Sequence, residues 1–126
     1  MKKLSCLFFV PILVFSCQKH EQTTIVGLWK ETSVYSRDNS GAFYWSGPSR
    51  FPLLLTLTED GKYSARYDVP AGYGVYQYDY STRQLRFENS SGNIETVIVS
   101  VLDDNYLITD HSVNGVVDYR QKFSRN

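Results

Sequence analysis

The sequence has few of the residues that would place it in several large functional classes. Its 126 residues include two cysteines and two histidines, and 13 basic and 13 acidic residues give a formal net charge of zero. Two cysteines are too few for a disulfide scaffold. A balanced charge supplies neither a basic surface for nucleic acid nor an acidic tail. We therefore expect no nucleic-acid partner.

Residues with catalytic or metal-binding chemistry are also scarce. After residue 24 there is one histidine, His111, no cysteine, no serine in a nucleophile-elbow pattern and no glycine-rich phosphate loop. Asp110 precedes His111, but successive residues of a strand point to opposite faces, so we expect no acid–base pair and a surface position for His111. No spacing of metal-ligating residues indicates a metal site. We expect a protein without catalysis, metal or cofactor.

The longest apolar run occupies residues 4–15 and follows Lys2 and Lys3. It is too short to cross a hydrocarbon core of ~30 Å as a helix, so it is typical of the apolar region of a secretory signal peptide. Val14, Ser16 and Cys17 then form a sequence that resembles a bacterial lipobox. The resemblance implies that residues 1–16 are removed and that Cys17 carries several acyl chains, enough for stable anchoring in a membrane.

Two alternatives to the lipoprotein interpretation are an ordinary cleaved signal, with Cys17 as a bystander, and a short buried helix. The residue after Cys17 is Gln18, not the aspartate associated with inner-membrane retention in enteric bacteria. We therefore expect an anchor in the bacterial outer membrane, with the protein facing either the periplasm or the surface. Residues 17–24 would form the lipidated N-terminus and a polar tether.

From residue 25 onward the apolar residues follow a two-residue period, which predicts β-strands. The alternation is clearest over residues 62–69, and Tyr76, Tyr78 and Tyr80 share one side of the next strand. Turn residues interrupt the pattern at 38–41, 59–61, 70–72, 81–83, 89–93, 103–105 and 114–115. Eight consecutive strands close most simply into a barrel, because closure removes the exposed sheet edges. We predict an all-β fold, an eight-stranded antiparallel up-and-down β-barrel over residues 25–126.

Short motifs along the predicted barrel resemble the lipocalins. Gly27 and Trp29 form a Gly-x-Trp at the start of the first strand, and residues 55–63, 74–76 and 119–125 are similar to later strands of the small lipocalin-like domains of bacterial lipoproteins. The resemblance covers about residues 25–125. It implies a lipocalin-like barrel with a ligand-binding role.

The Gly-x-Trp motif also has a physical interpretation. Gly27 lets the backbone approach a neighbour closely, and Trp29 fills the narrow end of the barrel with a large apolar ring. The first and last strands of such a barrel pair antiparallel, so the end of the last strand lies beside Trp29. Arg125 is then placed to stack its guanidinium on the indole, with Arg120 as its rival. We predict that Gly27, Trp29 and Arg125 form a structural plug.

Residues 38–51 form the longest connection and contain Phe43, Tyr44 and Trp45 in a row. A loop of this length is unusual unless it is functional or disordered, and three adjacent aromatic residues need cover. One interpretation is a short extra strand at 42–46 whose aromatic side chains pack on the barrel. The other is a lid that presents an aromatic surface to a ligand or a partner.

Large side chains dominate the positions predicted to face the interior: Trp29, Tyr35, Tyr63, Tyr67, Tyr76, Tyr78, Phe87, Tyr119 and Phe123. Glu31, Ser33 and Gln121 fall on the same faces and would bond the tyrosine hydroxyls. A barrel of eight strands is wide enough to be filled by side chains or to hold one small ligand. We expect partial filling, with any pocket small and near the open end.

The leading hypothesis is a lipid-anchored binding protein for a small apolar or amphipathic ligand, with a mouth formed by Phe43, Tyr44, Trp45, Tyr67, Tyr76 and Tyr78. The alternative is a protein-interaction, inhibitor or accessory module that uses a solid barrel as a scaffold, because tyrosine and tryptophan also anchor interfaces. A connected interior void of ~300 Å³ or more would favour the ligand. A packed interior with exposed aromatic residues at 43–45 would favour the partner.

Overall fold

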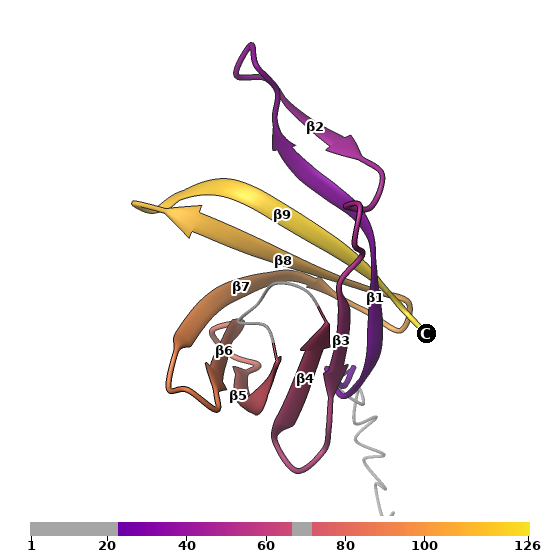
Figure 1. Ribbon diagram of the computed structural model, residues 1–126, viewed down its shortest axis with the longest axis vertical. Coiled ribbons are helices and arrows are strands. Elements are labelled where there is room, and N and C mark those ends of the chain that lie inside the picture. The colour runs from indigo at the N-terminus through magenta and orange to yellow at the C-terminus, as the bar shows by residue number, and fades with distance from the viewer. Residues whose placement is uncertain (1–22, 67–71) are drawn as a thin grey trace, which may run out of the picture.

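In a computed structural model that describes residues 23–66 and 72–126, every regular element is a β-strand (Figure 1). No helix in these two segments is long and apolar enough to cross a membrane. The strands are β1 (Gly27–Arg37), β2 (Phe43–Ser46), β3 (Leu54–Leu57), β4 (Lys62–Arg66), β5 (Gly72–Asp79), β6 (Gln84–Asn89), β7 (Ile94–Leu102), β8 (Tyr106–Val113) and β9 (Val116–Arg125).

Eight of the strands close into a barrel. From β3 to β9 each strand pairs antiparallel with the next along the chain, and β1 joins β3 to β9. The closing pair runs from Trp29 opposite Arg125 to Tyr35 opposite Arg120. This confirms the predicted all-β, eight-stranded, antiparallel up-and-down barrel. The topology is consistent with the lipocalin-like fold that the motifs resemble.

The ninth strand, β2, belongs to the long first connection. The first half of β1 pairs with β3, from Gly27 opposite Leu57 onward. Its second half pairs on the same side with β2, from Val34 opposite Ser46 to Arg37 opposite Phe43. The interpretation of this segment as a short extra strand is therefore confirmed, whereas its packing against the barrel is not. The β1–β2 hairpin rises beyond the barrel in Figure 1.

The β8–β9 hairpin also extends past the barrel wall. Pairing between β7 and β8 ends at Ile98 opposite Asp110, whereas β8 and β9 stay paired as far as Val113 opposite Val116. We call the part of the sheet beyond this point the flared sheet. It consists of β2, residues 33–37 of β1, residues 111–113 of β8 and residues 116–120 of β9.

A β-bulge in β1 separates the barrel from the flared sheet. The register of β1 against β9 shifts between Glu31 and Ser33. A bulge of this kind adds one residue to one strand and reverses which side chains face inward beyond it. Glu31 therefore faces the interior, but Ser33 and Tyr35 lie on the outer face. The expectation that Ser33 and Tyr35 face inward, which assumed unbroken alternation, is wrong.

The barrel interior is built from inward side chains of all eight strands. Trp29, Phe87 and Phe123 are almost completely buried, and Tyr63 packs its ring edge against Phe87 with centroids 4.9 Å apart. The other buried apolar residues are Ile25, Leu53, Leu55, Leu57, Ala65, Leu85, Val97, Val99 and Leu107. At roughly 25 cal/mol per Å² of buried apolar surface, this interior is the main source of stability.

Candidate functional site

One end of the barrel is sealed by Trp29, which is fully buried. Its indole N–H donates to the Ile25 carbonyl over 2.9 Å, and the Arg125 guanidinium carbon lies 4.2 Å from the ring centroid. Arg125 also donates to the carbonyl oxygens of Val26 and Thr24 over 2.8 and 2.9 Å. A cation held over an aromatic face is attracted by the ring quadrupole. These contacts tie the last strand to the residues that lead into the first.

Gly27 has no side chain, and the Arg125 guanidinium occupies the space that a side chain would fill. A Cβ at this position would come within 2.7 Å of Arg125 Nη1, and the backbone φ is +152°. Arg120, the other candidate for the plug, lies elsewhere. Its guanidinium carbon is 5.3 Å from the Tyr35 ring centroid, and its Nε is 3.1 Å from Asp110 Oδ1.

The aromatic residues predicted to form one ligand mouth lie at opposite ends of the barrel. Phe43 pairs with Arg37, the last residue of β1. The Tyr76 hydroxyl instead donates to the carbonyl of Thr58 over 2.6 Å, next to Leu57, which pairs with the first residue of β1. Tyr78 lies on the same side of β5 as Tyr76. The predicted common mouth is therefore wrong for the residues that can be placed.

Tyr67 and Cys17, the other predicted binding and lipidation residues, lie outside the residues that the structure describes.

The aromatic residues of β2 instead lie on both faces of the flared sheet. Phe43 stacks on Tyr35 with centroids 5.1 Å apart, and Trp45 lies 5.3 Å from the same ring. Tyr44 points to the opposite face, because side chains alternate along a strand. Tyr44 and Trp45 are 48% and 44% exposed, so the hairpin keeps an aromatic surface in solvent.

A chain of polar side chains crosses the inner face near the open end of the barrel. Glu31 is almost completely buried, and its Oε1 accepts from the N–H and the hydroxyl of Ser49 over 2.9 and 2.6 Å. Its other carboxylate oxygen accepts from Gln121 Nε2 over 2.9 Å. Glu31 thereby fastens the connection between β2 and β3 onto the barrel. The prediction that Glu31 and Gln121 face the interior is confirmed.

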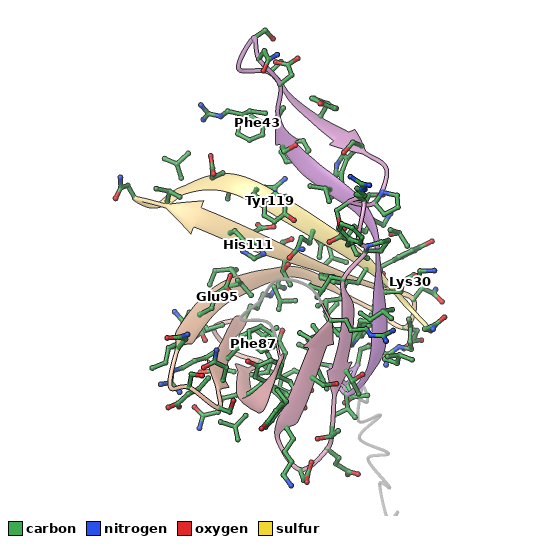
Figure 2. All side chains as sticks on the ribbon, viewed as in Figure 1. Lys30, Phe43, Phe87, Glu95, His111 and Tyr119 are labelled. Carbon is green, nitrogen blue, oxygen red and sulfur yellow. The ribbon has the colours of Figure 1, made fainter. Side chains whose placement is uncertain are left out.

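The chain continues through His111. Gln121 Oε1 lies 3.0 Å from His111 Nε2, and His111 Nδ1 lies 3.3 Å from Glu95 Oε1. Since Gln121 donates to Glu31 through its nitrogen, its oxygen accepts from His111 Nε2–H. Glu95 and His111 bridge β7 and β8 where the backbones no longer pair, as Figure 2 shows. The prediction of a surface His111 is wrong, because Thr109, His111 and Gln121 share the inner face.

The interior itself is packed. The void that touches this polar chain, lined by Leu53, Phe87, Thr109, His111 and other inward residues, measures about 10 Å³. This is room for about one water molecule at most. A ligand of ordinary size does not fit in this void. Together with the exposed Tyr44 and Trp45, this packing meets the criterion given above for a protein partner, and a small-molecule site would have to lie outside this void.

A larger cleft of about 370 Å³ lies at the Trp29 end. It exists because β7 is longer than β6. β6 begins at Gln84, which pairs with Ile98, so the rest of β7 has no β6 neighbour. The β5–β6 turn lies beside it instead, and the Val99 N–H donates to the Arg83 carbonyl over 2.9 Å. The cleft is lined by Thr23, Tyr78, Tyr80, Arg83, Val99, Ser100, Val101 and Leu102.

The cleft is lined by phenols, one cation and a smaller apolar surface that includes Val101 and Leu102. Tyr78 and Tyr80 meet edge to face with centroids 4.4 Å apart, and Tyr80 Oη accepts from the Ile25 N–H over 3.2 Å. Burial, and after it the neighbouring Tyr80, raises the pKa of the Tyr78 phenol above 10.0, so Tyr78 stays neutral at physiological pH. Arg83 forms no ion pair within the described part of the chain. Such a site suits a molecule with an apolar body and an anionic head.

The sequence pattern indicated part of this cleft. The alternation placed Tyr78 and Tyr80 on one side of a strand, but nothing in the sequence linked them to Arg83 or to residues 99–102. The connection depends on how far β7 extends past β6. The stagger between strands of a barrel is not encoded in any single strand's pattern.

Comparisons with known proteins identify no relative of this chain. The chain matches no protein-family model, no curated protein and no solved structure.

Proposed function

We propose that the protein is a lipid-anchored binding protein that holds a small amphipathic molecule with an anionic head in the cleft at the Trp29 end. The observation that carries this proposal is the cleft of about 370 Å³, in which Arg83 has no ion-pair partner among the described residues. Its volume falls in the range of about 300–1,000 Å³ of small-molecule sites. The phenols of Tyr78 and Tyr80 supply further polar contacts beside the apolar walls.

The position of the cleft supports a ligand that comes from a membrane. Thr23 lines the cleft and lies six residues after Cys17 in the sequence. Six residues reach at most about 20 Å. If Cys17 carries acyl chains, Thr23 lies within about 20 Å of the membrane, and the flared sheet lies at the opposite end of β1 from the cleft. We propose that this membrane is the outer membrane of a bacterium and that the protein lies on its periplasmic or its surface side.

The Arg83→Gln variant is expected to bind decanoate at least tenfold more weakly than the wild type, a loss of about 1.4 kcal/mol. The substitution removes the charge at the cleft and keeps a side chain of similar length at a backbone position with a φ of +61°. Isothermal titration calorimetry on the purified protein measures the dissociation constant. Decylamine, which carries the opposite charge on the same tail, is expected to bind weakly to both proteins.

Arg86→Gln is the matched control, because Arg86 is partly exposed on β6 and pairs at the surface with Glu88 over 3.6 Å. Decanoate binding is expected to be unchanged in this variant. Equal losses in Arg83→Gln and Arg86→Gln would show a general charge effect and would contradict binding in the cleft. Val101→Phe, which fills the cleft, is expected to abolish binding.

Labelled palmitate in a growing culture of the bacterial host is expected to mark the wild-type protein and to leave Cys17→Ser unmarked. The acyl chains need the Cys17 thiol for their thioether link, and no other cysteine follows Cys17 in the sequence. Fluorography of the immunoprecipitated protein provides the measurement. Label in the Cys17→Ser variant would contradict the anchor without affecting the cleft proposal, which the decanoate titration tests separately.

A further inference from the structure

Within residues 23–66 and 72–126, β2 has an open edge along its whole length. Among these residues it pairs with β1 alone and ends the sheet order. The Asp38 N–H donates to the Ala42 carbonyl over 2.9 Å at the start of the hairpin. Because hydrogen-bonded pairs alternate along an antiparallel ladder, Tyr44 and Ser46 direct their backbone groups to β1. The N–H and C=O groups of Phe43 and Trp45 therefore point away from the sheet.

Apart from its length of four residues, the edge carries none of the features that normally prevent an added strand. Exposed edge strands are usually very short, hold lysine, proline or a bulge, or lie under another segment. β2 reads Phe-Tyr-Trp-Ser, pairs with β1 in unbroken register and contains no charge. A barrel otherwise removes sheet edges by closure, so an aromatic edge strand outside it calls for a functional explanation.

Cations outnumber carboxylates beside this edge. Residues 37–58 contain Arg37, Arg50 and one carboxylate, Asp38, whose Oδ1 accepts from the N–H groups of Ser40 and Ala42. Arg37, opposite Phe43 on β1, stacks over the Phe43 ring at 4.7 Å and has no ion pair among the described residues. Two copies of the hairpin would bring like charges together, whereas an acidic segment would complement them. Charge thus favours a different protein over a second copy of this chain.

We propose that the β2 edge binds an extended, acidic segment of a partner protein as an additional β-strand. The backbone groups of Phe43 and Trp45 pair with the segment. Its alternate side chains lie against the Tyr35–Trp45 face and the Tyr44 face of the flared sheet, and its carboxylates lie near Arg37. Strand addition of this kind takes affinity from main-chain hydrogen bonds and specificity from the flanking side chains. This surface lies at the opposite end of β1 from the cleft and is independent of it.

The test uses the full-length chain, labelled with nitrogen-15 and held in detergent, with an eight-residue peptide of alternating glutamate and valine. Amide hydrogen exchange is followed by NMR with and without saturating peptide. In the free protein the Phe43 and Trp45 amides are expected to exchange at least tenfold faster than those of Tyr44 and Ser46. The peptide is expected to slow exchange at Phe43 and Trp45 at least tenfold. A peptide with lysine in place of glutamate is expected to bind at least tenfold more weakly.

Two variants at one position separate main-chain pairing from side-chain contact. Trp45→Ala removes the ring and keeps the outward N–H, whereas Trp45→Pro removes both and leaves the β1-facing bonds of Tyr44 and Ser46 in place. The proline variant is expected to bind the acidic peptide at least tenfold more weakly than the alanine variant. Emission from the remaining tryptophan, Trp29, reports that each variant is folded. Equal affinities of the two variants would overturn strand addition.

Three further results would also overturn the proposal. The first is unchanged amide exchange at Phe43 and Trp45 with saturating acidic peptide, and the second is equal affinity for the lysine peptide. The third is protection of the Phe43 and Trp45 amides without any peptide, together with a doubled molecular mass of the protein. The last result would assign the edge to a second copy of this chain.

Discussion

The Trp29→Ala variant is expected to lose about 3–5 kcal/mol of free energy of unfolding, the usual cost of truncating a buried tryptophan to alanine. Trp29 is fully buried and lies where β1, β3 and β9 meet. Its removal leaves a cavity under the Arg125 guanidinium and frees the carbonyl of Ile25 that the indole N–H bonds. The barrel would lose one of the contacts between its first and last strands, that of the indole with the Arg125 guanidinium.

Chemical denaturation followed by circular dichroism measures this loss. Trp45→Ala is the control, because it makes the same substitution at a side chain that is 44% exposed on the flared sheet. We expect that variant to lose about 1 kcal/mol or less, as for a partly exposed aromatic contact. Similar losses for the two variants would show that Trp29 is not the seal of the barrel.

The sequence pattern predicted the topology because the information is local. A two-residue period and turn residues mark each strand, and eight strands without helices leave closure as the simplest way to remove edges. The Gly-x-Trp motif indicated which end is sealed, since Trp29 is large and begins the first strand. The rivalry between Arg125 and Arg120 was left open by the sequence. In the structure Arg125 lies over Trp29, because the pairing of β9 places it opposite that residue.

The predictions that were wrong have two causes. A bulge after Glu31 turns Tyr35 outward, whereas His111 follows the regular alternation of Leu107 and Thr109 onto the inner face beside Glu95. One added residue reverses every later side chain of a strand, yet it leaves no clear mark in the composition. The candidate cleft was missed for a related reason, since it depends on strand stagger and not on any strand's own residues.

The two ends of β1 have different chemistry. Its first residues lie at the Trp29 seal beside the cleft, where Arg83 and the tyrosines offer a site for a small molecule. Its last residues carry β2, where backbone groups and aromatic rings offer a surface for a polypeptide. A packed interior separates them, with a void of about 10 Å³ at the polar chain. The packed barrel therefore lies between the two proposed binding surfaces.

The polar chain inside the barrel gives the second large expected loss of stability. The Gln121→Leu variant is expected to lose about 3 kcal/mol of unfolding free energy, because each buried polar group left without a partner costs roughly 1–3 kcal/mol. Gln121 is almost completely buried and bonds both Glu31 Oε2 and His111 Nε2, over 2.9 and 3.0 Å. Leucine has a similar volume but satisfies neither group. Thermal and chemical denaturation measure the change.

Gln77→Leu is the matched control, since Gln77 is exposed on β5 and the same substitution there is expected to change stability by about 0.5 kcal/mol or less. The double variant Glu31→Leu with Gln121→Leu distinguishes a polar network from simple packing. Because it removes the stranded carboxylate together with its partner, it is expected to cost less than the sum of the two single variants. Additive losses would mean that Glu31 and Gln121 stabilise the barrel separately, and that the hydrogen bond between them contributes little to holding the β2–β3 connection against the interior.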